Sequence, residues 1–150
     1  MSTSLYPADF YADRRTHTLH AAQRIFAALP PGLRRNRVAD IGCGTGTFLA
    51  ASGAAFRFGI EGDWVRPDML DTPGIAFENR DLEKPFSGPR VDLVLSLEVA
   101  EHLSPARAES FVADLCAMAP SVLFSAAIPG QGGVGHVNEQ WPSFWAARFA

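Results

Sequence analysis

Lysine is almost absent from the sequence. Lys84 is the single lysine among 13 basic residues, and 16 acidic residues give the chain a formal net charge of −3. A nucleic-acid-binding surface usually shows a clustered excess of basic side chains, so we expect no nucleic-acid partner. Arg34, Arg35 and Arg37 do gather before the first expected strand, and we interpret them as a solvated loop face.

Cysteine and long apolar runs are also scarce. Cys43 and Cys116 lie far apart in the sequence, and the first residues lack the pattern of a secretory signal. We therefore expect a reduced, cytoplasmic protein rather than a disulfide scaffold. No apolar run approaches the roughly 18 residues that a membrane span needs, which predicts no membrane partner. The 150 residues are 47% hydrophobic, enough for one globular domain with a core.

Short apolar runs alternate with helical patterns along the chain. A helix is predicted over residues 8–29, within a helical N-terminal segment 1–33, because apolar side chains recur there at helical spacing. Strands are predicted at residues 38–41, 57–61, 75–78, 91–97 and 122–126. Further helices are predicted over residues 45–52, over 62–71 with an interruption at Pro67, from the N-cap Ser104 to Pro120, and from near Trp141.

This alternation predicts a parallel α/β sheet that is covered by helices on both faces. Ligands of such sheets bind at the carboxyl ends of the strands. A glycine-rich turn follows the first strand, where Gly42, Gly44 and Gly46 come directly after Asp40 and Ile41. Glycine accepts a positive φ and lets the backbone approach a ligand, so the turn is typical of a nucleotide site.

Two acids follow the next two strands. Glu61 ends the second strand, 19 residues after Gly42, and a carboxylate there can accept hydrogen bonds from both ribose hydroxyls. Asp81 follows the third strand, where it could accept from an adenine amino group while the Leu82 N–H donates to the ring. The alternatives are a solvated loop acid at Glu61 and a local turn acid at Asp81.

The glycine spacing discriminates between cofactor classes. A dinucleotide fingerprint needs its third glycine at position 47, which is Thr47 here, whereas Gly46 comes one residue earlier. Asp40 would repel a pyrophosphate but would attract a cationic amino-acid group. The residues therefore favour a nucleoside that carries a cation, with a nicotinamide oxidoreductase as the disfavoured alternative.

Four segments together resemble the motifs of class I S-adenosylmethionine-dependent methyltransferases. The first is Asp40-Ile41-Gly42-Cys43-Gly44-Thr45-Gly46. The next three are Gly59-Ile60-Glu61-Gly62, Arg80-Asp81-Leu82 and residues 92–103 (DLVLSLEVAEHL). The resemblance extends from about residue 36 to 145.

The resemblance implies a Rossmann-like three-layer sandwich with strand order 3-2-1-4-5 and S-adenosyl-L-methionine as cofactor. It implies that Asp40 and the turn holding Gly42, Cys43 and Gly44 bind the methionine end. Glu61 with Gly62 would bind the ribose and Asp81 with Leu82 the adenine, while Ser96 and Leu97 would line the pocket near the sulfonium.

The fourth motif also suggests a metal. Glu98, Glu101 and His102 would share one face of a helical turn, and such a set could hold Mg²⁺ or Mn²⁺. The pattern resembles the metal-assisted ubiquinone-pathway O-methyltransferases and small-RNA 2′-O-methyltransferases. The alternative is that the same segment occurs in members that use no metal.

The implied reaction is methyl transfer to a small-molecule oxygen or nitrogen. Because the sulfonium is already a good leaving group, the protein contributes mainly proximity and orientation. A hydroxyl acceptor needs a base, for which His102 and His136 are the candidates. A neutral amine needs none.

The expected sheet lacks the C-terminal hairpin of a sixth and a seventh strand that the resemblance implies. The fifth strand would then be an exposed edge, which is a template for association. We expect either a truncated form or a partner chain at this edge, such as the second copy of a homodimer. An inactive S-adenosylmethionine-binding module is the alternative to an active enzyme.

Overall fold

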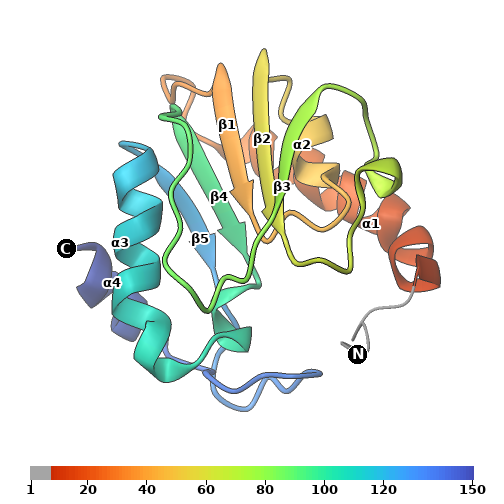
Figure 1. Ribbon diagram of the computed structural model, residues 1–150. Coiled ribbons are helices and arrows are strands. Elements are labelled where there is room, and N and C mark those ends of the chain that lie inside the picture. The colour runs from red at the N-terminus through yellow and green to blue at the C-terminus, as the bar shows by residue number, and fades with distance from the viewer. Residues whose placement is uncertain (1–7) are drawn as a thin grey trace.

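The computed structural model describes residues 8–150, with side chains from residue 16 onward, so the start of the predicted segment 1–33 lies outside the described residues. Its centre is a five-stranded sheet with the order β3-β2-β1-β4-β5 (Figure 1). All neighbouring strands are parallel. The strands are β1 (Arg37–Ile41), β2 (Phe56–Glu61), β3 (Ile75–Asn79), β4 (Leu93–Leu97) and β5 (Val122–Ser125). The predicted Rossmann-like α/β fold and strand order are confirmed.

Helices cover both faces of the sheet, as Figure 1 shows. They are α1 (Ala8–Ala28), α2 (Thr47–Ala51), α3 (Ala108–Met118) and α4 (Pro142–Phe149). Successive strand residues point to opposite faces, so Val38 packs on the side of α1 and α2 while Ala39 packs on the side of α3 and α4. None of the described helices is long and apolar enough to cross a membrane.

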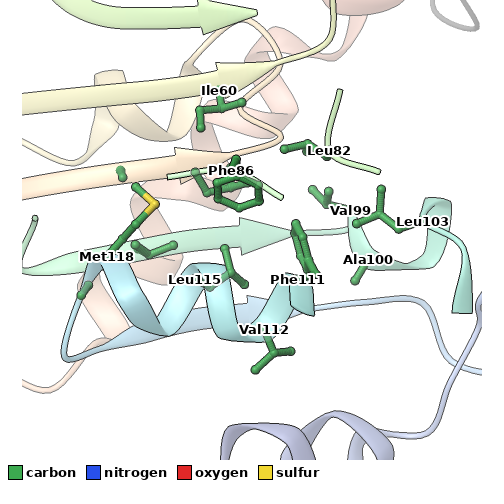
Figure 2. Packing of buried hydrophobic residues seen from close by; sticks show 14 of the residues in the cluster. Ile60, Leu82, Phe86, Val99, Ala100, Leu103, Phe111, Val112, Leu115 and Met118 are labelled. Atoms are coloured by element: carbon green, nitrogen blue, oxygen red, sulfur yellow. The ribbon is translucent and has the colours of Figure 1, made fainter. Parts of the chain in front are cut away.

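Helix α3 presents its apolar face to the sheet (Figure 2). Phe111, Leu115 and Met118 are at most 2% exposed. Phe86, from the loop between β3 and β4, meets Phe111 edge to face with a centroid distance of 5.9 Å. This packing seats the β3–β4 loop on α3, a contact between segments far apart in sequence.

The helix predicted over residues 62–71 is wrong. Only a 3-10 turn forms there, Pro67–Met69. The residue before a proline is pushed to extended backbone, and Arg66 has φ −104° and ψ 155°. Asn79 Nδ2 instead donates to the carbonyls of Gly62 and Val65, which would otherwise accept helical hydrogen bonds.

Other predicted boundaries shift as well, and the predicted side-chain cap at Ser104 does not form. Helix α2 begins at Thr47 rather than at residue 45, because Gly46 is left-handed with φ 79°. Strand β4 begins at Leu93 rather than at residue 91, since the Val91 N–H already bonds to the Met118 carbonyl. Ser104 does not cap a helix through its side chain, because its hydroxyl donates to Glu83.

Strand β5 has no strand on its outer side among residues 8–150. A groove of about 490 Å³ lies beside it, lined by residues of β5 and α4 that include Val122, Phe124, Trp145 and Phe149. An unpaired edge is complementary to an antiparallel copy of itself across a two-fold axis. We propose that a second copy of the chain pairs along β5.

We predict a concentration-dependent dimer in sedimentation velocity, because edge pairing satisfies the outer N–H and C=O groups of β5. Leu123→Lys should shift the protein toward monomer, since a charge on an edge strand opposes pairing. Phe77→Lys is the control, because Phe77 is partly buried against the same apolar cluster as Leu123 but lies on β3, at the opposite edge of the sheet. A wild type that stays monomeric at every concentration would rule out this dimer.

Candidate active site

The glycine-rich turn bends over the end of β2. The N–H groups of Gly42 and Cys43 both donate to the Ile60 carbonyl, at 2.8 and 3.1 Å. Gly42 has φ +83°, and a Cβ there would lie 2.3 Å from Val99 Cγ2. Only glycine therefore fits this position, and its backbone packs directly against the segment that follows β4.

Glu61, the last residue of β2, holds its carboxylate in a fixed position against this turn. Oε2 accepts from the Gly44 N–H at 2.8 Å, and Oε1 accepts from the Gly62 N–H at 2.9 Å. The residue is 9% exposed. Burial raises the pKa of Glu61, while the two N–H groups lower it in part. Each oxygen keeps a lone pair that can accept a further hydrogen bond.

Asp40 is the second buried acid, on β1 beside β2. Burial and, second, the charge of Glu61 raise the pKa of Asp40 from its ordinary value near 3.8 to about 8. Near neutral pH, Asp40 therefore holds a proton, first because burial disfavours its charged form and second because the charge of Glu61 lies nearby. A ligand that brings a cation or hydroxyl donors would relieve this repulsion.

Cys43 lies between the two acids in sequence, but its side chain points into the core. It belongs to the cluster with Leu49, and a Cβ on Gly59 would lie 2.8 Å from its Sγ. The pKa of the Cys43 thiol is raised by burial and by the nearby Asp40 and Glu61. Only the backbone of Cys43 is thus suited to contact a ligand.

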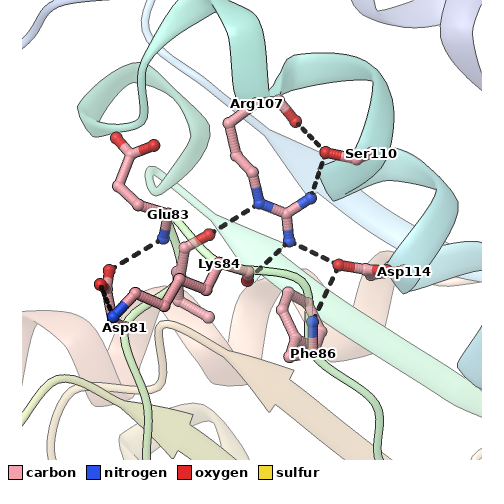
Figure 3. A network of polar contacts seen from close by, with 8 residues as sticks. Asp81, Glu83, Lys84, Phe86, Arg107, Ser110 and Asp114 are labelled. Carbon is pink, nitrogen blue, oxygen red and sulfur yellow. Dashed lines mark hydrogen bonds and ion pairs between the residues drawn. The ribbon is translucent and has the colours of Figure 1, made fainter.

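The other predicted cofactor residues differ in environment. Ser96 is fully buried at the end of β4, and its hydroxyl has no hydrogen-bond partner within the described part of the chain. Leu97 is half-buried and Leu82 is buried. Asp81 is exposed and accepts from the Glu83 N–H at 3.1 Å (Figure 3), so it stabilises its own turn.

The predicted metal face of Glu98, Glu101 and His102 is wrong. Glu98 has φ 57°, so the helical spacing fails at that residue, and the turn that follows is the 3-10 turn Ala100–His102. The Glu98 carboxylate instead accepts from Ser125 Oγ at 2.7 Å and from Gln131 Nε2 at 3.3 Å.

A different triad comes together beside Glu98. One side-chain ligand atom from each of Glu101, His102 and His136 lies within 4.8 Å of the others. The two imidazole rings meet edge to face at 4.9 Å. Glu101 is fully buried, and neither carboxylate oxygen has a hydrogen-bond partner among residues 8–150. Burial raises the pKa of Glu101, whereas burial followed by His136 lowers the pKa of His102.

Sequence reasoning missed the partner of His136. Its Nδ1 lies 3.0 Å from Glu139 Oε1, and Glu139 also accepts from the N–H groups of Gly130 and Gly132, both at 2.8 Å. A Cβ on Gly133 would lie 2.3 Å from His136 Nε2. The sequence signal that could have found this partner is the run of glycines at positions 130, 132 and 133, directly before His136 and Glu139.

No protein-family model and no curated protein sequence matches the chain. Solved structures do. Phosphoethanolamine N-methyltransferase 1 of Haemonchus contortus, in complex with phosphoethanolamine and S-adenosylhomocysteine, is 17% identical with a TM-score of 0.66, over 93% of this chain and 38% of that one.

Two bacterial and archaeal structures match similarly. A methyltransferase of Archaeoglobus fulgidus, described as dependent on S-adenosylmethionine, is 21% identical with a TM-score of 0.64, over 89% of this chain and 66% of that one. The amino pentose methyltransferase CalS10 of Micromonospora echinaspora is 22% identical with a TM-score of 0.58, over 93% of this chain and 67% of that one.

The chain therefore has the fold of class I S-adenosylmethionine-dependent methyltransferases, and the resemblance read from its four motifs is confirmed at the level of the fold. The chain spans between 38% and 67% of the length of these three proteins.

The raised pKa of Asp40 predicts a pH-dependent stability. Unfolding lets this carboxyl titrate near 3.8 instead of about 8, so the folded state binds more protons between these values. The free energy of unfolding should fall as pH rises through this window, by at most about 1.4 kcal/mol per pH unit from this group.

Urea unfolding at pH 5, 6.5 and 8 measures this dependence. Asp40→Asn should flatten the decline, because the asparagine carries no titrating proton. The control is Asp68→Asn, on an exposed turn where Arg66 lowers the pKa of the aspartate. Because Asp68 does not titrate between pH 5 and 8, this variant should show the same fall in the free energy of unfolding as the wild type. An unchanged slope in Asp40→Asn would contradict the assignment.

Proposed function

We propose that the chain binds S-adenosyl-L-methionine and transfers its methyl group to a small-molecule hydroxyl or amine. The observation that carries this proposal is the pair of buried acids, Asp40 and Glu61, over a glycine turn at the carboxyl edge of the sheet. Both cysteines are free, in keeping with the cytoplasmic location that we expect.

The residues present fit this cofactor. Asp40 and the turn Gly42–Gly44 would hold the methionine end, because the ammonium compensates the ionised carboxyl. The free lone pairs of Glu61 would accept from the ribose hydroxyls. The unpaired Ser96 hydroxyl and Leu97 would face the sulfonium, and Asp81 with the Leu82 N–H would contact the adenine. The bound cofactor supplies an electrophilic methyl group with a good leaving group.

A base for a hydroxyl acceptor is available near this edge. The contact with Glu139 fixes the orientation of His136 and favours a proton on Nδ1, which leaves Nε2 as the acceptor nitrogen. His102 has a lowered pKa, so it is neutral near pH 7 and can also accept a proton. The Val137 and Asn138 N–H groups both donate to the Glu101 carbonyl, at 2.9 and 3.0 Å, and thereby hold the loop of His136 against the turn of His102.

We predict that S-adenosylhomocysteine binds in isothermal calorimetry and that NADH does not. Glu61→Ala should weaken S-adenosylhomocysteine by roughly 10- to 100-fold, because the ribose loses charge-assisted acceptors. Glu78→Ala, which removes a half-exposed acid from the neighbouring strand β3, should bind like the wild type.

The opposite ligand preference, with NADH bound and S-adenosylhomocysteine ignored, would overturn the proposed function. Binding alone, without turnover in a screen of hydroxyl and amine acceptors with methyl-labelled cofactor, would identify an inactive binding module.

We further propose, as a second use of this triad, that Glu101, His102 and His136 can hold one divalent cation, Mg²⁺ or Mn²⁺, with the two histidines then acting as ligands and not as bases. A buried carboxylate without hydrogen-bond partners is costly unless it is protonated or bound to a cation. A cation there would lower the pKa of an acceptor hydroxyl. The two imidazoles favour Mn²⁺ over Mg²⁺, which prefers oxygen ligands.

A Mn²⁺ titration followed by calorimetry tests this site. We expect Glu101→Gln to abolish the binding, because the amide cannot replace an anionic ligand. Glu98→Gln should retain it, since the Glu98 carboxylate is bonded to Ser125 and Gln131. Identical titrations of wild type and Glu101→Gln would exclude a metal on this triad.

A further inference from the structure

The loop between β3 and β4 contains no helix, so its backbone groups need partners from elsewhere. It carries Asp81 and Leu82, which lie at the carboxyl end of β3. Five hydrogen bonds join its residues 82–86 to one segment, residues 104–114, around the start of α3, and Figure 3 shows those made by Arg107 and Asp114. The position of this end of the site is thus decided by contacts between the loop and α3.

Arg107 is the centre of these contacts. Its Nε donates to the Leu82 carbonyl at 2.9 Å, and one terminal nitrogen donates to the Lys84 carbonyl at 3.1 Å. The same terminal nitrogen binds Asp114, whose Oδ2 also accepts from the Phe86 N–H at 3.1 Å. The guanidinium is therefore bonded to the loop at two carbonyls and, through Asp114, at a third residue.

The environment of Arg107 makes this arrangement rigid. The residue is 4% exposed, and its charge is compensated by Asp114. The guanidinium carbon lies 5.7 Å from the Phe86 ring centre and 5.6 Å from that of Phe111. A planar guanidinium with several donors in a fixed geometry can span these acceptors, whereas a lysine ammonium cannot.

A second contact holds the residue between the two carbonyls. The Ser104 N–H donates to Glu83 Oε1 at 2.7 Å, and its hydroxyl donates to Glu83 Oε2 at 2.9 Å. Leu82, Glu83 and Lys84 are thus each bonded to the segment that begins α3. Three consecutive residues directly after Asp81 are fixed in this way.

We infer that Arg107 is a positioning residue that sets the base specificity of the cofactor site. By holding the Leu82 carbonyl, it fixes the peptide plane between Leu82 and Glu83. The N–H of that peptide, on Glu83, donates to Asp81 Oδ1 at 3.1 Å, so Arg107 positions the carboxylate that would accept from the adenine amino group. It touches no ligand itself and acts through the backbone of Leu82. This inference rests on the proposed function, in which Asp81 and Leu82 contact the adenine.

The test compares two ligands that differ only at the base edge. S-adenosylhomocysteine has an amino group at C6, and S-inosylhomocysteine has an oxygen there. In calorimetry, the wild type should bind S-adenosylhomocysteine at least ~10-fold more tightly than S-inosylhomocysteine. The adenine amino group can donate to Asp81, whereas the oxygen at the same position of the other base cannot. A wild type that binds neither compound would reject the proposed function and the inference with it, whereas a wild type that prefers adenine leaves the role of Arg107 to be decided by the variants.

Arg107→Lys should reduce the preference for adenine to about 3-fold or less, with most of the loss in the affinity for S-adenosylhomocysteine. A general loss of structure would weaken both ligands equally and leave their ratio unchanged. The matched control is Arg90→Lys, because Arg90 also joins this loop to α3, through the Ala117 carbonyl at 2.7 Å, but next to the amino end of β4. Its ratio should equal that of the wild type.

An unchanged ratio in a folded Arg107→Lys would overturn the inference, as would an equal change in Arg90→Lys. If Arg107→Lys does not fold, Ser104→Ala decides, since it removes only the hydroxyl contact with Glu83. A smaller preference for adenine in Ser104→Ala would support positioning by this segment. A wild-type ratio there would contradict it.

Discussion

The burial of two carboxyl groups at adjacent strand ends is the constraint on which the site depends. Asp40 and Glu61 lie on β1 and β2, in the middle of the sheet. Water cannot solvate them well, so the structure compensates with backbone N–H groups at Glu61 and with a retained proton at Asp40. Such a site is poorly satisfied by itself and is suited to a ligand that brings a positive charge and hydroxyl donors.

The glycine turn and the segment after β4 are coupled by this arrangement. Gly42 packs against Val99 without room for a side chain, and Val99 directly precedes the turn that carries Glu101 and His102. The backbone of that turn holds the loop of His136 through the Glu101 carbonyl. The glycine turn of the proposed cofactor site and the loop of the candidate base His136 are therefore connected through the segment after β4, by direct packing and by backbone hydrogen bonds.

Features within one strand or turn could be predicted, because they depend on local patterns. Alternating apolar strands and helices indicated the parallel sheet, the resemblance of the four motifs implied its strand order, and the spacing from Gly42 to Glu61 indicated acids at neighbouring strand ends. The helix over residues 62–71 was wrong because Pro67 restricts Arg66 and because Asn79, distant in sequence, takes the carbonyls. Helix propensity depends on neighbours in the sequence, so it could not show that the side chain of Asn79 would bind these carbonyls.

The side-chain constellations depended on contacts that no local pattern contains. A helical spacing placed Glu98 with Glu101 and His102, but its left-handed backbone and its bonds to Ser125 and Gln131 turn it away. His136 takes its place because the glycine-rich loop folds around Glu139. The sequence by itself determined the fold class, since this follows from the hydrophobic period, while the glycine spacing and the resemblance of the four motifs suggested the cofactor that we propose. Only the tertiary structure decided that His136 meets Glu101 and His102 and how α3 holds the β3–β4 loop, because these contacts join residues more than 20 positions apart in the sequence.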